Sequence, residues 1–572
     1  MALDLRIVVG GEAGQGAQTI GFILAKAFAR LGCHVFADQD YESRIRGGHN
    51  FFRIRVRDSH VSAVSEVIDI LVALNRESLS LHCPRLGENG VAIADMNTDP
   101  ELVRQYGILT VPLSDLAAEK AGNKLMANSV AIGSVMGMLG FNSEILSGVI
   151  KDHFQSSAIV ENNIKAARAG YDYARQRYDR SSSYDLSSIM RIERMLLNGN
   201  ESVALGAMAA GCKFLAAYPM TPSTPIIEFM AANAADFATV VIQPEDEIAA
   251  IHMAIGAAYS GVRAMTVTSG GGFSLMVEAL GLSGMTETPV VIVEGQRAGP
   301  AIGLPTRTEQ GDLLFAVNAS HGEFPRAVFA PSCAEDGFWL TIKAFNMAEK
   351  YQIPVIVMTD HHLASSYFTA EKFDLSGVYI DRGLPLSEDE MGKLSEYKRH
   401  RITPSGISPR ALPMQSHALV VTDSDEHSEA GHIIEDAETR TRMVAKRMKK
   451  LEGLRRDMAP PHVFGPKTAD ISLVGWGSSF GALHEAMGLL RQQGLNINLV
   501  HFTEVWPLPA QETTDLLGGD RKIYVAENNA TGQFARLLNS ETGLKISGTV
   551  LKYDGRPFTS QYIIDRLKGM LP

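Results

Sequence analysis

The sequence predicts an α/β protein made of three α/β domains. Short apolar runs of strand length alternate with helix-patterned stretches through most of the chain, which is typical of parallel sheets covered by helices. The alternation occupies residues 1–180, 195–382 and 466–572, and the intervening residues 383–465 carry few strand signals, so we expect a connector there. A length of 572 residues agrees with this division, since domains average about 150 residues.

The composition is that of a folded protein. Hydrophobic residues make up 45% of the chain and charged residues 20%, which leaves enough apolar side chains for a core in each domain. The net charge of -11 disfavours nucleic acid and anionic membranes as partners. No basic and apolar leader precedes the first strand, and no apolar run is long enough to span a membrane, so we expect a cytoplasmic protein.

Four cysteines are scattered along the sequence, at Cys33, Cys83, Cys212 and Cys333. No two of them have a metal-ligand spacing, and an iron–sulfur cluster usually needs several thiolates close together. This distribution favours free thiols in a reducing compartment and argues against a cluster held by this chain alone.

The first domain begins with a predicted strand at Ile7–Val9 and a helix over Gln15–Leu31, whose apolar residues recur on one face. Phe51–Arg57 alternates apolar and charged residues, as a strand with one solvated face does. Val67–Leu74 is a nearly continuous apolar run, typical of a buried strand. A polar stretch over residues 173–198 ends this domain.

The second domain contains predicted strands separated by helical patterns, and the third begins with a strand near Ala469. In the connector, a basic helix is expected near Arg440–Arg456. The predicted strands of the second domain are Phe214–Ala217, Thr239–Ile242, Arg263–Thr268, Val290–Glu294 and Val355–Thr359.

A glycine-rich segment, Gly10-Gly-Glu-Ala-Gly-Gln-Gly16, lies between the first strand and the first helix. Glycines such as Gly14 and Gly16 allow backbone N–H groups at a helix N-terminus to approach a phosphate. The spacing departs from the dinucleotide fingerprint, and on spacing alone a tight strand-to-helix turn is the simpler interpretation.

Two arginines, Arg44 and Arg46, precede a pair of glycines in a second polar segment, Ser43–Asn50. Beside flexible glycines they are suited to clamp a phosphate or a carboxylate. A solvated hairpin explains the same residues equally well.

Tyr218-Pro-Met-Thr-Pro-Ser-Thr-Pro225 directly follows a predicted strand. Its prolines restrict the backbone on either side of Thr221 and place that hydroxyl at the carboxyl edge of a parallel sheet, where ligands bind in such folds. Alternatively, the segment is a rigid turn in which Ser223 or Thr224 caps the next helix, which leaves Thr221 unexplained.

Pro244 is followed by three acidic residues and an apolar run, which predicts a helix with proline at its first position and acids at the positive end of its dipole. The same pattern puts Glu247 on the helix face that carries Ile251 and Ala254. A helix start alone does not require a carboxylate on an apolar face, so Glu247 is a candidate catalytic residue.

Arg297 follows an apolar strand pattern and is expected at a sheet edge, where its guanidinium is suited to bind a substrate carboxylate. Arg307 lies in the Gly- and Pro-rich loop that comes next and is a second candidate. A surface ion pair is the alternative for either residue.

Taken together, these segments resemble the α subunits of 2-oxoacid:ferredoxin oxidoreductases. The Gly10–Gly16 and Ser43–Asn50 segments are similar to the γ-type domain of these enzymes, and the chain from Ala469 onward is similar to their transketolase C-terminal-like domain. The resemblance spans nearly the whole chain in γ-then-α order. Its other matching segments are Tyr218–Thr224, Glu245–Ala250, Gly295–Thr306 and Ala526–Gln533.

The resemblance implies that residues 195–382 form a pyrimidine-type domain that binds thiamine diphosphate. Glu247 would hydrogen-bond the aminopyrimidine ring of that cofactor, and Tyr218 and Pro219 would also line its site. Thr221 would lie beside the substrate and the reactive ring, and Arg297 would bind the carboxylate of the 2-oxoacid.

The resemblance also implies a second subunit. The diphosphate, its Mg²⁺ ion and a [4Fe–4S] cluster would belong to a β-type partner, ferredoxin would accept the electrons, and the assembly would be a dimer of heterodimers. Gly14 and Gly16 of the γ-type domain would approach coenzyme A. The reaction implied is oxidative decarboxylation of a 2-oxoacid to an acyl-CoA, or the reverse, CO2-fixing reaction.

The methionine in Tyr218–Thr224 and the Gly303–Arg307 loop look like those of enzymes that convert 2-oxoglutarate to succinyl-CoA, and Arg307 would then bind the distal carboxylate. Pyruvate or a branched-chain 2-oxoacid is the alternative substrate. Two further alternatives are a non-catalytic regulatory subunit of a thiamine enzyme and the β-type half of an NAD-linked 2-oxoacid dehydrogenase, which lacks an N-terminal γ-type domain.

Overall fold

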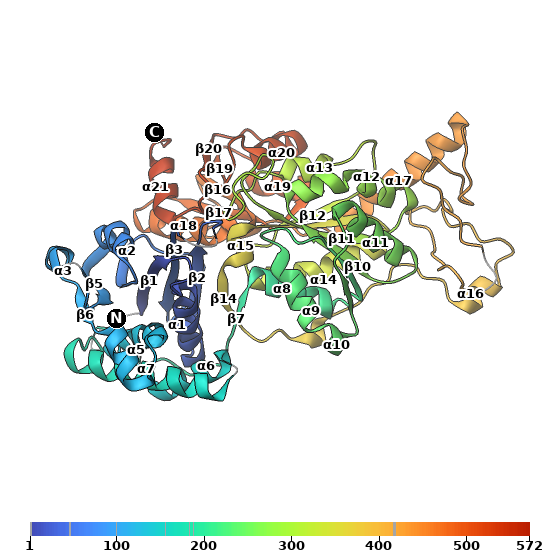
Figure 1. The fold of residues 1–572 in the computed structure, drawn as a ribbon. Coiled ribbons are helices and arrows are strands. Elements are labelled where there is room, and N and C mark those ends of the chain that lie inside the picture. The colour runs from blue at the N-terminus through green and yellow to red at the C-terminus, as the bar shows by residue number, and fades with distance from the viewer. Residues whose placement is uncertain are drawn as a thin grey trace. The chain divides into compact units, whose positions relative to one another are not determined.

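A computed structural model of the chain describes residues 3–44, 47–98, 100–154, 156–181, 183–186, 188–415 and 419–571 (Figure 1). The chain divides into two compact units. Unit 1 comprises Met1–Leu197, Ser365–Phe373 and Thr559–Gln561, and unit 2 comprises Asn198–Ala364, Asp374–Phe558 and Tyr562–Pro572. Sheets with helices packed on them are found in both units, which confirms the predicted α/β fold class.

The sheet of unit 1 is mixed rather than wholly parallel. Among the described residues its strand order is β6-β5-β4-β1-β3-β2-β14-β7, and β1 pairs in parallel with β4 but antiparallel with β3. Only eight residues separate β2 from β3, too few for the crossover that a parallel pair needs. The strands are β1 (Asp4–Glu12), β2 (His34–Asp40), β3 (His49–Arg57), β4 (Ile68–Ala73), β5 (Leu86–Asp95), β6 (Leu109–Val111), β7 (Met195–Asn198) and β14 (Tyr367–Ala370).

A strand from far along the chain extends this sheet. β14 pairs antiparallel with β2, and the Val35 N–H donates to Thr369 Oγ1 (2.9 Å) across a separation of 334 residues. The fold of unit 1 therefore depends on a segment that follows most strands of the first sheet of unit 2 in the sequence.

Helices cover both faces of the unit 1 sheet. Leu5, Ile7 and Val9 of β1 face a core formed with α1 and α4 to α7, whereas Val8 faces α2 and α3. α1 begins at Ala17, two residues later than predicted, because Gly16 forms its N-cap with φ of 86°. The helices are α1 (Ala17–Leu31), α2 (Arg76–His82), α3 (Pro100–Tyr106), α4 (Leu113–Ala121), α5 (Ala127–Met138), α6 (Ser143–His153) and α7 (Ser157–Arg177).

The first sheet of unit 2 has the strand order β18-β12-β13-β11-β10-β8-β9 within the described residues. Its pairs are parallel except for β12 with β18, so the carboxyl ends of β8, β10 and β11 meet at one edge. The predicted strands of this domain are all present, with small shifts at their ends. They are β8 (Phe214–Ala216), β9 (Val240–Ile242), β10 (Ala264–Thr268), β11 (Val290–Gln296), β12 (Ala327–Phe329), β13 (Pro354–Asp360) and β18 (Glu504–Trp506).

Helices α8, α9 and α14 pack on one face of this sheet, and α11 and α12 pack on the other. The second face is the one that carries the candidate acidic residue. The helices are α8 (Gly199–Ala209), α9 (Thr224–Ala232), α10 (Ala234–Phe237), α11 (Glu247–Tyr259), α12 (Gly270–Thr286), α13 (Leu313–Asn318), α14 (Ala334–Tyr351) and α15 (His361–Ser365).

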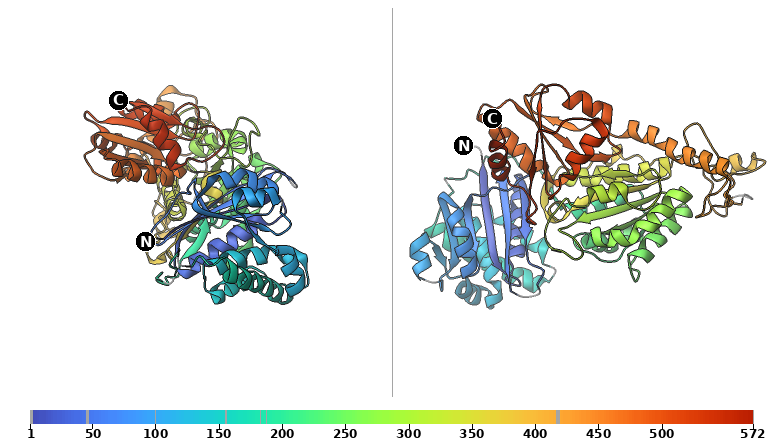
Figure 2. Two further views of the ribbon diagram at one scale, coloured as in Figure 1. Left: turned by 90° about the vertical axis from the view of Figure 1, so that its left-hand side faces the viewer. Right: turned by 90° about the horizontal axis from the view of Figure 1, so that it is seen from above.

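A second sheet in unit 2, of order β15-β17-β16-β19-β20, contains the C-terminal strands. Ile292 of the first sheet and Val500 of this one belong to a single apolar cluster, so the two sheets share a core. Figure 2 shows the ribbon of the C-terminal sheet, in red, beside that of the first sheet. Its elements are β15 (His462–Phe464), β16 (Ile471–Trp476), β17 (Ile497–Phe502), β19 (Lys522–Glu527), β20 (Gly548–Leu551), α18 (Phe480–Gln492), α19 (Ala510–Leu517), α20 (Gln533–Thr542) and α21 (Ser560–Lys568).

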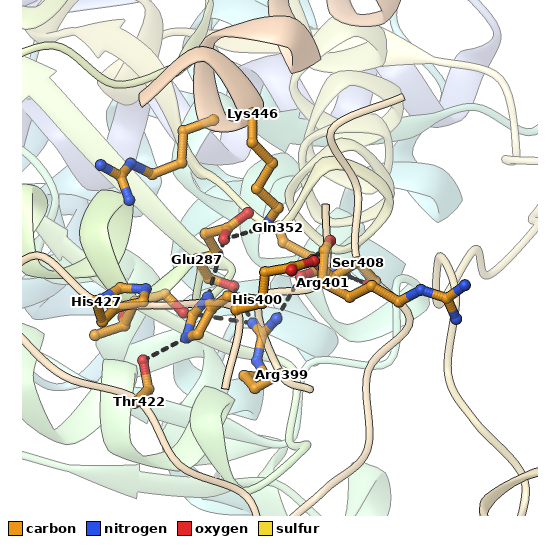
Figure 3. A network of polar contacts seen from close by, with 12 residues as sticks. Glu287, Gln352, Arg399, His400, Arg401, Ser408, Thr422, His427 and Lys446 are labelled. Carbon is orange, nitrogen blue, oxygen red and sulfur yellow. Dashed lines mark hydrogen bonds and ion pairs between the residues drawn. The ribbon is translucent and has the colours of Figure 1, made fainter. Parts of the chain in front are cut away.

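The segment between the two sheets of unit 2 contains α16 (Glu388–Gly392) and α17 (Ala437–Asp457), and α17 confirms the helix predicted near Arg440–Arg456. A buried polar network attaches it (Figure 3). Glu287, at the C-terminal end of α12, is 0% exposed and forms ion pairs with Lys446 and, at 2.5 Å, with Lys450 of α17. His400 Nδ1 lies 2.9 Å from the same carboxylate.

In this network a single acidic side chain, that of Glu287, pairs with more than one basic side chain. Arg399 donates from Nη2 to the backbone oxygen of Glu287 (2.6 Å), and the Glu287 carboxylate itself pairs with both Lys446 and Lys450. Burial lowers the pKa of Lys446 to about 7. Burial alone would raise the pKa of Glu287, but Lys446 and Lys450 hold it well below its usual range. Glu287 is therefore the charge on which the attachment of α17 depends.

Replacing Glu287 by Gln tests this dependence. The amide leaves Lys446 and Lys450 buried without a counter-charge, so we expect α17 to lose about 3 kcal/mol or more of local stability. Amide hydrogen exchange over Ala437–Asp457 measures the loss. Glu278→Gln, on the exposed side of α12, is the matched control and should leave that exchange unchanged. Equal exchange in the two variants would contradict the prediction.

Candidate active site

The candidate site residues of unit 2 lie at the carboxyl edge of its first sheet. The Tyr218–Pro225 turn follows β8, the glycine-rich start of α12 follows β10, and Arg297 follows β11. In parallel sheets this edge is where ligands bind.

Glu247 is the first residue of α11. The predicted helix start at Pro244 is wrong, because the Asp246 side chain accepts the Ala249 N–H (2.8 Å) from an extended backbone and so forms the N-cap. The predicted buried face is confirmed, since Glu247 lies among the buried residues of α11 together with Ile251.

The Glu247 carboxylate lies against α12. A Cβ atom added at Gly272 would be 2.7 Å from Glu247 Oε1 and would also collide with Thr268 Oγ1, so only glycine leaves room there. Glu247 is 4% exposed, and its carboxylate makes no hydrogen bond or ion pair with the described residues. A nearly buried carboxylate without a partner in its own chain is typical of a ligand-binding residue.

The turn after β8 brings Thr221 to the same edge. Ser223 occupies the N-cap position of α9, as the alternative interpretation predicts, but its Oγ donates to the Thr268 backbone oxygen (2.7 Å) and makes no capping bond to the helix. Thr221 is half-buried, and its backbone oxygen accepts from Arg297 Nη1 (2.9 Å). Two of the predicted residues are thus in direct contact.

Tyr218 and Pro219 begin this turn. The Tyr218 side chain is 38% exposed and Pro219 is half-buried. Asn200, which the sequence did not single out, donates to the Pro222 oxygen (2.9 Å) and ties the turn to the start of α8.

Arg297 and Arg307 mark the two ends of one closed loop. The Ala298 N–H donates to the Arg307 oxygen (3.4 Å), and the Leu304 N–H donates to the Ala298 oxygen (2.9 Å). Arg307 Nη1 donates to the Thr306 oxygen (3.2 Å). The loop therefore brings the backbones of both predicted arginines together, at the carboxyl end of β11.

Two acidic residues of this edge were missed in the sequence. Glu294 is fully buried within β11, and neither of its carboxylate oxygens has a hydrogen-bond partner among the described residues. Burial, followed by the charge of Asp312, which precedes α13, raises the pKa of Glu294 well above its usual value. A lone glutamate inside an apolar strand pattern is the signal that marks Glu294, whereas nothing local marks Asp312.

The glycine-rich segment lies in unit 1 and forms a tight turn. Gly14 and Gly16 have φ of 91° and 86°, the Glu12 N–H donates to Gln15 Oε1 (2.7 Å), and Asn128 Nδ2 donates to the Gln15 oxygen (3.0 Å). The turn interpretation is confirmed, and no side chain caps the start of α1 within the described residues.

Of the second polar segment, Arg46 lies outside the described residues. Arg44 forms an ion pair with Glu42 (3.0 Å) and is largely exposed, as the solvated interpretation predicts. His49 follows the glycine pair, and its Nε2 lies 2.8 Å from Nε2 of His82.

Searches for other features concern only the described part of the chain. There, no three His, Cys, Asp or Glu side chains are grouped so as to hold a metal ion. No helix in that part has both the length and the apolar character needed to cross a bilayer.

Comparisons with protein families match three stretches of the chain. Residues 205–446 match the pyruvate flavodoxin/ferredoxin oxidoreductase, thiamine diP-binding family. Residues 6–173 match the pyruvate ferredoxin/flavodoxin oxidoreductase family, and residues 469–563 match pyruvate:ferredoxin oxidoreductase core domain II.

Full-length relatives are similar along the whole chain. The 2-oxoacid:ferredoxin oxidoreductase subunit alpha of Sulfolobus sp is 34% identical, over 97% of this chain and 95% of the relative. The 2-oxoglutarate oxidoreductase subunit KorA of Mycobacterium tuberculosis is 29% identical, over 97% and 89%. The solved 2-oxoglutarate:ferredoxin oxidoreductase from Magnetococcus marinus, with 2-oxoglutarate, coenzyme A and succinyl-CoA bound, is 30% identical with a TM-score of 0.92, over 99% of both chains.

A pair of glycine substitutions tests the contact between α11 and α12. Gly272→Ala forces Glu247 or Thr268 to move, so we expect a loss of about 1–3 kcal/mol in the free energy of unfolding. Gly271→Ala is the control, because a Cβ there meets only the Ala301 oxygen, at 3.9 Å. Urea unfolding compares the two, and equal stability would show that the carboxylate is not held against Gly272.

Proposed function

The chain belongs to the family of 2-oxoacid:ferredoxin oxidoreductase α subunits, and we propose that it is the subunit, with a fused γ-type domain, of an enzyme that acts on 2-oxoglutarate. The reaction proposed is oxidative decarboxylation to succinyl-CoA with reduction of ferredoxin, or the reverse, CO2-fixing reaction. The names of the KorA relatives and of the Magnetococcus marinus structure support 2-oxoglutarate, whereas other relatives are named only for 2-oxoacids.

One observation carries the catalytic part of the proposal, namely the unpartnered carboxylate of Glu247. The thiamine diP-binding match covers this residue, and an aminopyrimidine nitrogen is the kind of partner that such a carboxylate lacks. When bound, thiamine diphosphate supplies a carbon nucleophile for the 2-oxo group. Glu247 would hold and move a proton at the aminopyrimidine nitrogen, and Gly272 leaves the space that its carboxylate needs.

Arg297 and Thr221 are proposed to bind the substrate. The contact between Arg297 and the Thr221 backbone orients the guanidinium, which then has further N–H groups for the 2-oxoacid carboxylate. Tyr218 and Pro219 are proposed to line the cofactor site. Arg307, at the other end of the same loop, would bind the distal carboxylate of 2-oxoglutarate.

The remaining components are proposed to come from partners. A β-type subunit would hold the diphosphate, its Mg²⁺ ion and a [4Fe–4S] cluster, in a dimer of heterodimers, and would pass electrons to ferredoxin. Coenzyme A would meet the turn that contains Gly14 and Gly16 in unit 1, whose backbone N–H groups suit a phosphate.

Substitution of Glu247 tests the catalytic proposal. In the complex with the β-type partner, Glu247→Gln should lower kcat about 100-fold or more, because an amide cannot exchange the proton. The rate is measured as the reduction of a viologen, with 2-oxoglutarate as the electron donor and coenzyme A as the acceptor of the acyl group. Glu245→Gln, exposed two residues earlier, is the control. Full activity of Glu247→Gln would favour a non-catalytic regulatory subunit.

The substrate preference is tested at the two arginines. Arg297→Ala should raise KM about tenfold for both 2-oxoglutarate and pyruvate, since each loses a charged hydrogen bond. Arg307→Ala should raise KM for 2-oxoglutarate alone, because pyruvate has no distal carboxylate. Steady-state kinetics with both substrates decide this, and an equal effect of Arg307→Ala on the two would exclude its proposed role.

A further inference from the structure

Two histidines of unit 1 that have no part in the proposed reaction share a hydrogen bond. His49 Nε2 lies 2.8 Å from His82 Nε2, so one ring donates and the other accepts. His49 is the first residue of β3 and belongs to the second polar segment, whereas His82 is the last residue of α2. The bond therefore ties the end of α2 to the sheet.

The surroundings of this pair suit two neutral rings. His82 is 3% exposed, and Phe51 contacts both rings, with centroids 5.6 Å from His49 and 5.1 Å from His82. The two Nδ1 atoms are shielded from water and have no hydrogen-bond partner among the described residues. Protonation of one ring would leave a charged N–H without an acceptor, and protonation of both would remove the lone pair that the bond needs.

The helix that the pair holds also contacts the glycine-rich turn. A Cβ atom on Gly10, where this turn begins, would be 2.9 Å from Ser78 Oγ and 3.4 Å from His49 Cε1. At the start of α2, Asn75 accepts the Ser78 N–H (2.9 Å) and donates from Nδ2 to Gln15 Oε1 (3.3 Å). A displacement of α2 would therefore disturb the turn both at its beginning and at Gln15.

We propose that the neutral His49–His82 pair is a pH-sensitive clasp that fixes α2, and through it the turn at Gly14 and Gly16, in the conformation that binds coenzyme A. The part that concerns coenzyme A rests on the proposed function. Both histidines are positioning residues, because they act through α2 and the turn and not through contact with the ligand.

The charged groups that face His49 are acidic. Glu77 of α2, Asp40 of β2 and Glu42 raise the pKa of His49, but burial is the largest cause and lowers it below its usual value. Glu12 lies opposite His49 where β1 pairs with β3. The Nδ1 atom of His49 still has no acceptor among the described residues, so these acids do not supply the partner that a second proton needs.

The charged groups that face His82 are basic. Burial lowers the pKa of His82 to about 3, and the charges of His49, Arg85 and Arg53 act in the same direction. The neighbouring Cys83 thiol is neutral, because burial raises its pKa to about 11. Released rings bind protons more readily than clasped ones, so the stability that the pair contributes is present above about pH 6.5 and is lost as the pH falls below it.

Amide hydrogen exchange over α2 tests the clasp in the assembled enzyme. The protection of α2, corrected for the intrinsic exchange rate, is compared with that of α5, which has no ionisable side chain. In wild type it should fall about tenfold relative to α5 between about pH 7.5 and 5.5. His82→Gln should abolish this fall, because an amide can turn to donate to neutral His49 or to accept from its charged form.

Two further variants complete this comparison. His49→Gln places the same amide on the half-buried member of the pair and should also abolish the fall, so the test remains open if His82→Gln does not fold. His321→Asn replaces an exposed histidine of unit 2 and should keep the pH dependence of wild type.

The KM for coenzyme A tests the effect on binding, measured with 2-oxoglutarate and a viologen. The ratio of KM at about pH 5.5 to KM at about pH 7.5 should be about tenfold larger in wild type and His321→Asn than in His82→Gln. The kcat at saturating coenzyme A should show no such difference, because the clasp positions the binding turn. His82→Leu leaves His49 without its partner and should raise KM about tenfold already at the higher pH.

An equal pH dependence of α2 exchange in wild type and in both glutamine variants would overturn the clasp. Equal KM ratios in wild type and His82→Gln would overturn its connection to coenzyme A. An assembled wild-type complex that oxidises no 2-oxoacid would reject the proposed function together with the coenzyme A part of the proposal. The exchange measurement would then still decide whether the pair holds α2.

Discussion

The cost of placing a carboxyl group away from water is the constraint on which unit 2 depends. Such a group needs a cation, a proton or a ligand, because an isolated buried charge is several kcal/mol unfavourable. Glu287 has Lys446 and Lys450, burial raises the pKa of Glu294 so that its proton is retained, and the carboxylate of Glu247 has neither a cation nor a hydrogen-bond donor within the described residues. The three glutamates thus meet this cost in three different ways, and the ligand proposed for Glu247 is a cofactor.

Helix α12 links the acidic residues near the carboxyl edge of the first sheet of unit 2. Its first residue contacts Asp312, its third leaves space for Glu247, and its last turn ends at Glu287. Three glycines at the start of this helix allow two carboxyl groups to approach its positive end. A single helix therefore connects the proposed cofactor contact with the network that attaches α17.

Local patterns in the sequence predict the elements and the residues that end strands. Arg297, Thr221 and the buried face of Glu247 follow from such patterns, since each depends on its immediate neighbours. The predicted start of α11 at Pro244 was wrong because Asp246 forms the N-cap, so the helix begins at Glu247. The approach of Asp312 to the start of α12 and the position of β14 could not be predicted, because both depend on contacts between separate segments.

The strand β14 has a consequence for how this polypeptide can be divided. It pairs with β2 of unit 1, although it follows most strands of the first sheet of unit 2 in the sequence. The stretch of unit 1 that contains it is only Ser365–Phe373. A fragment ending near residue 195 would display the unpaired edge of β2, and the remaining fragment would carry the strand that completes it.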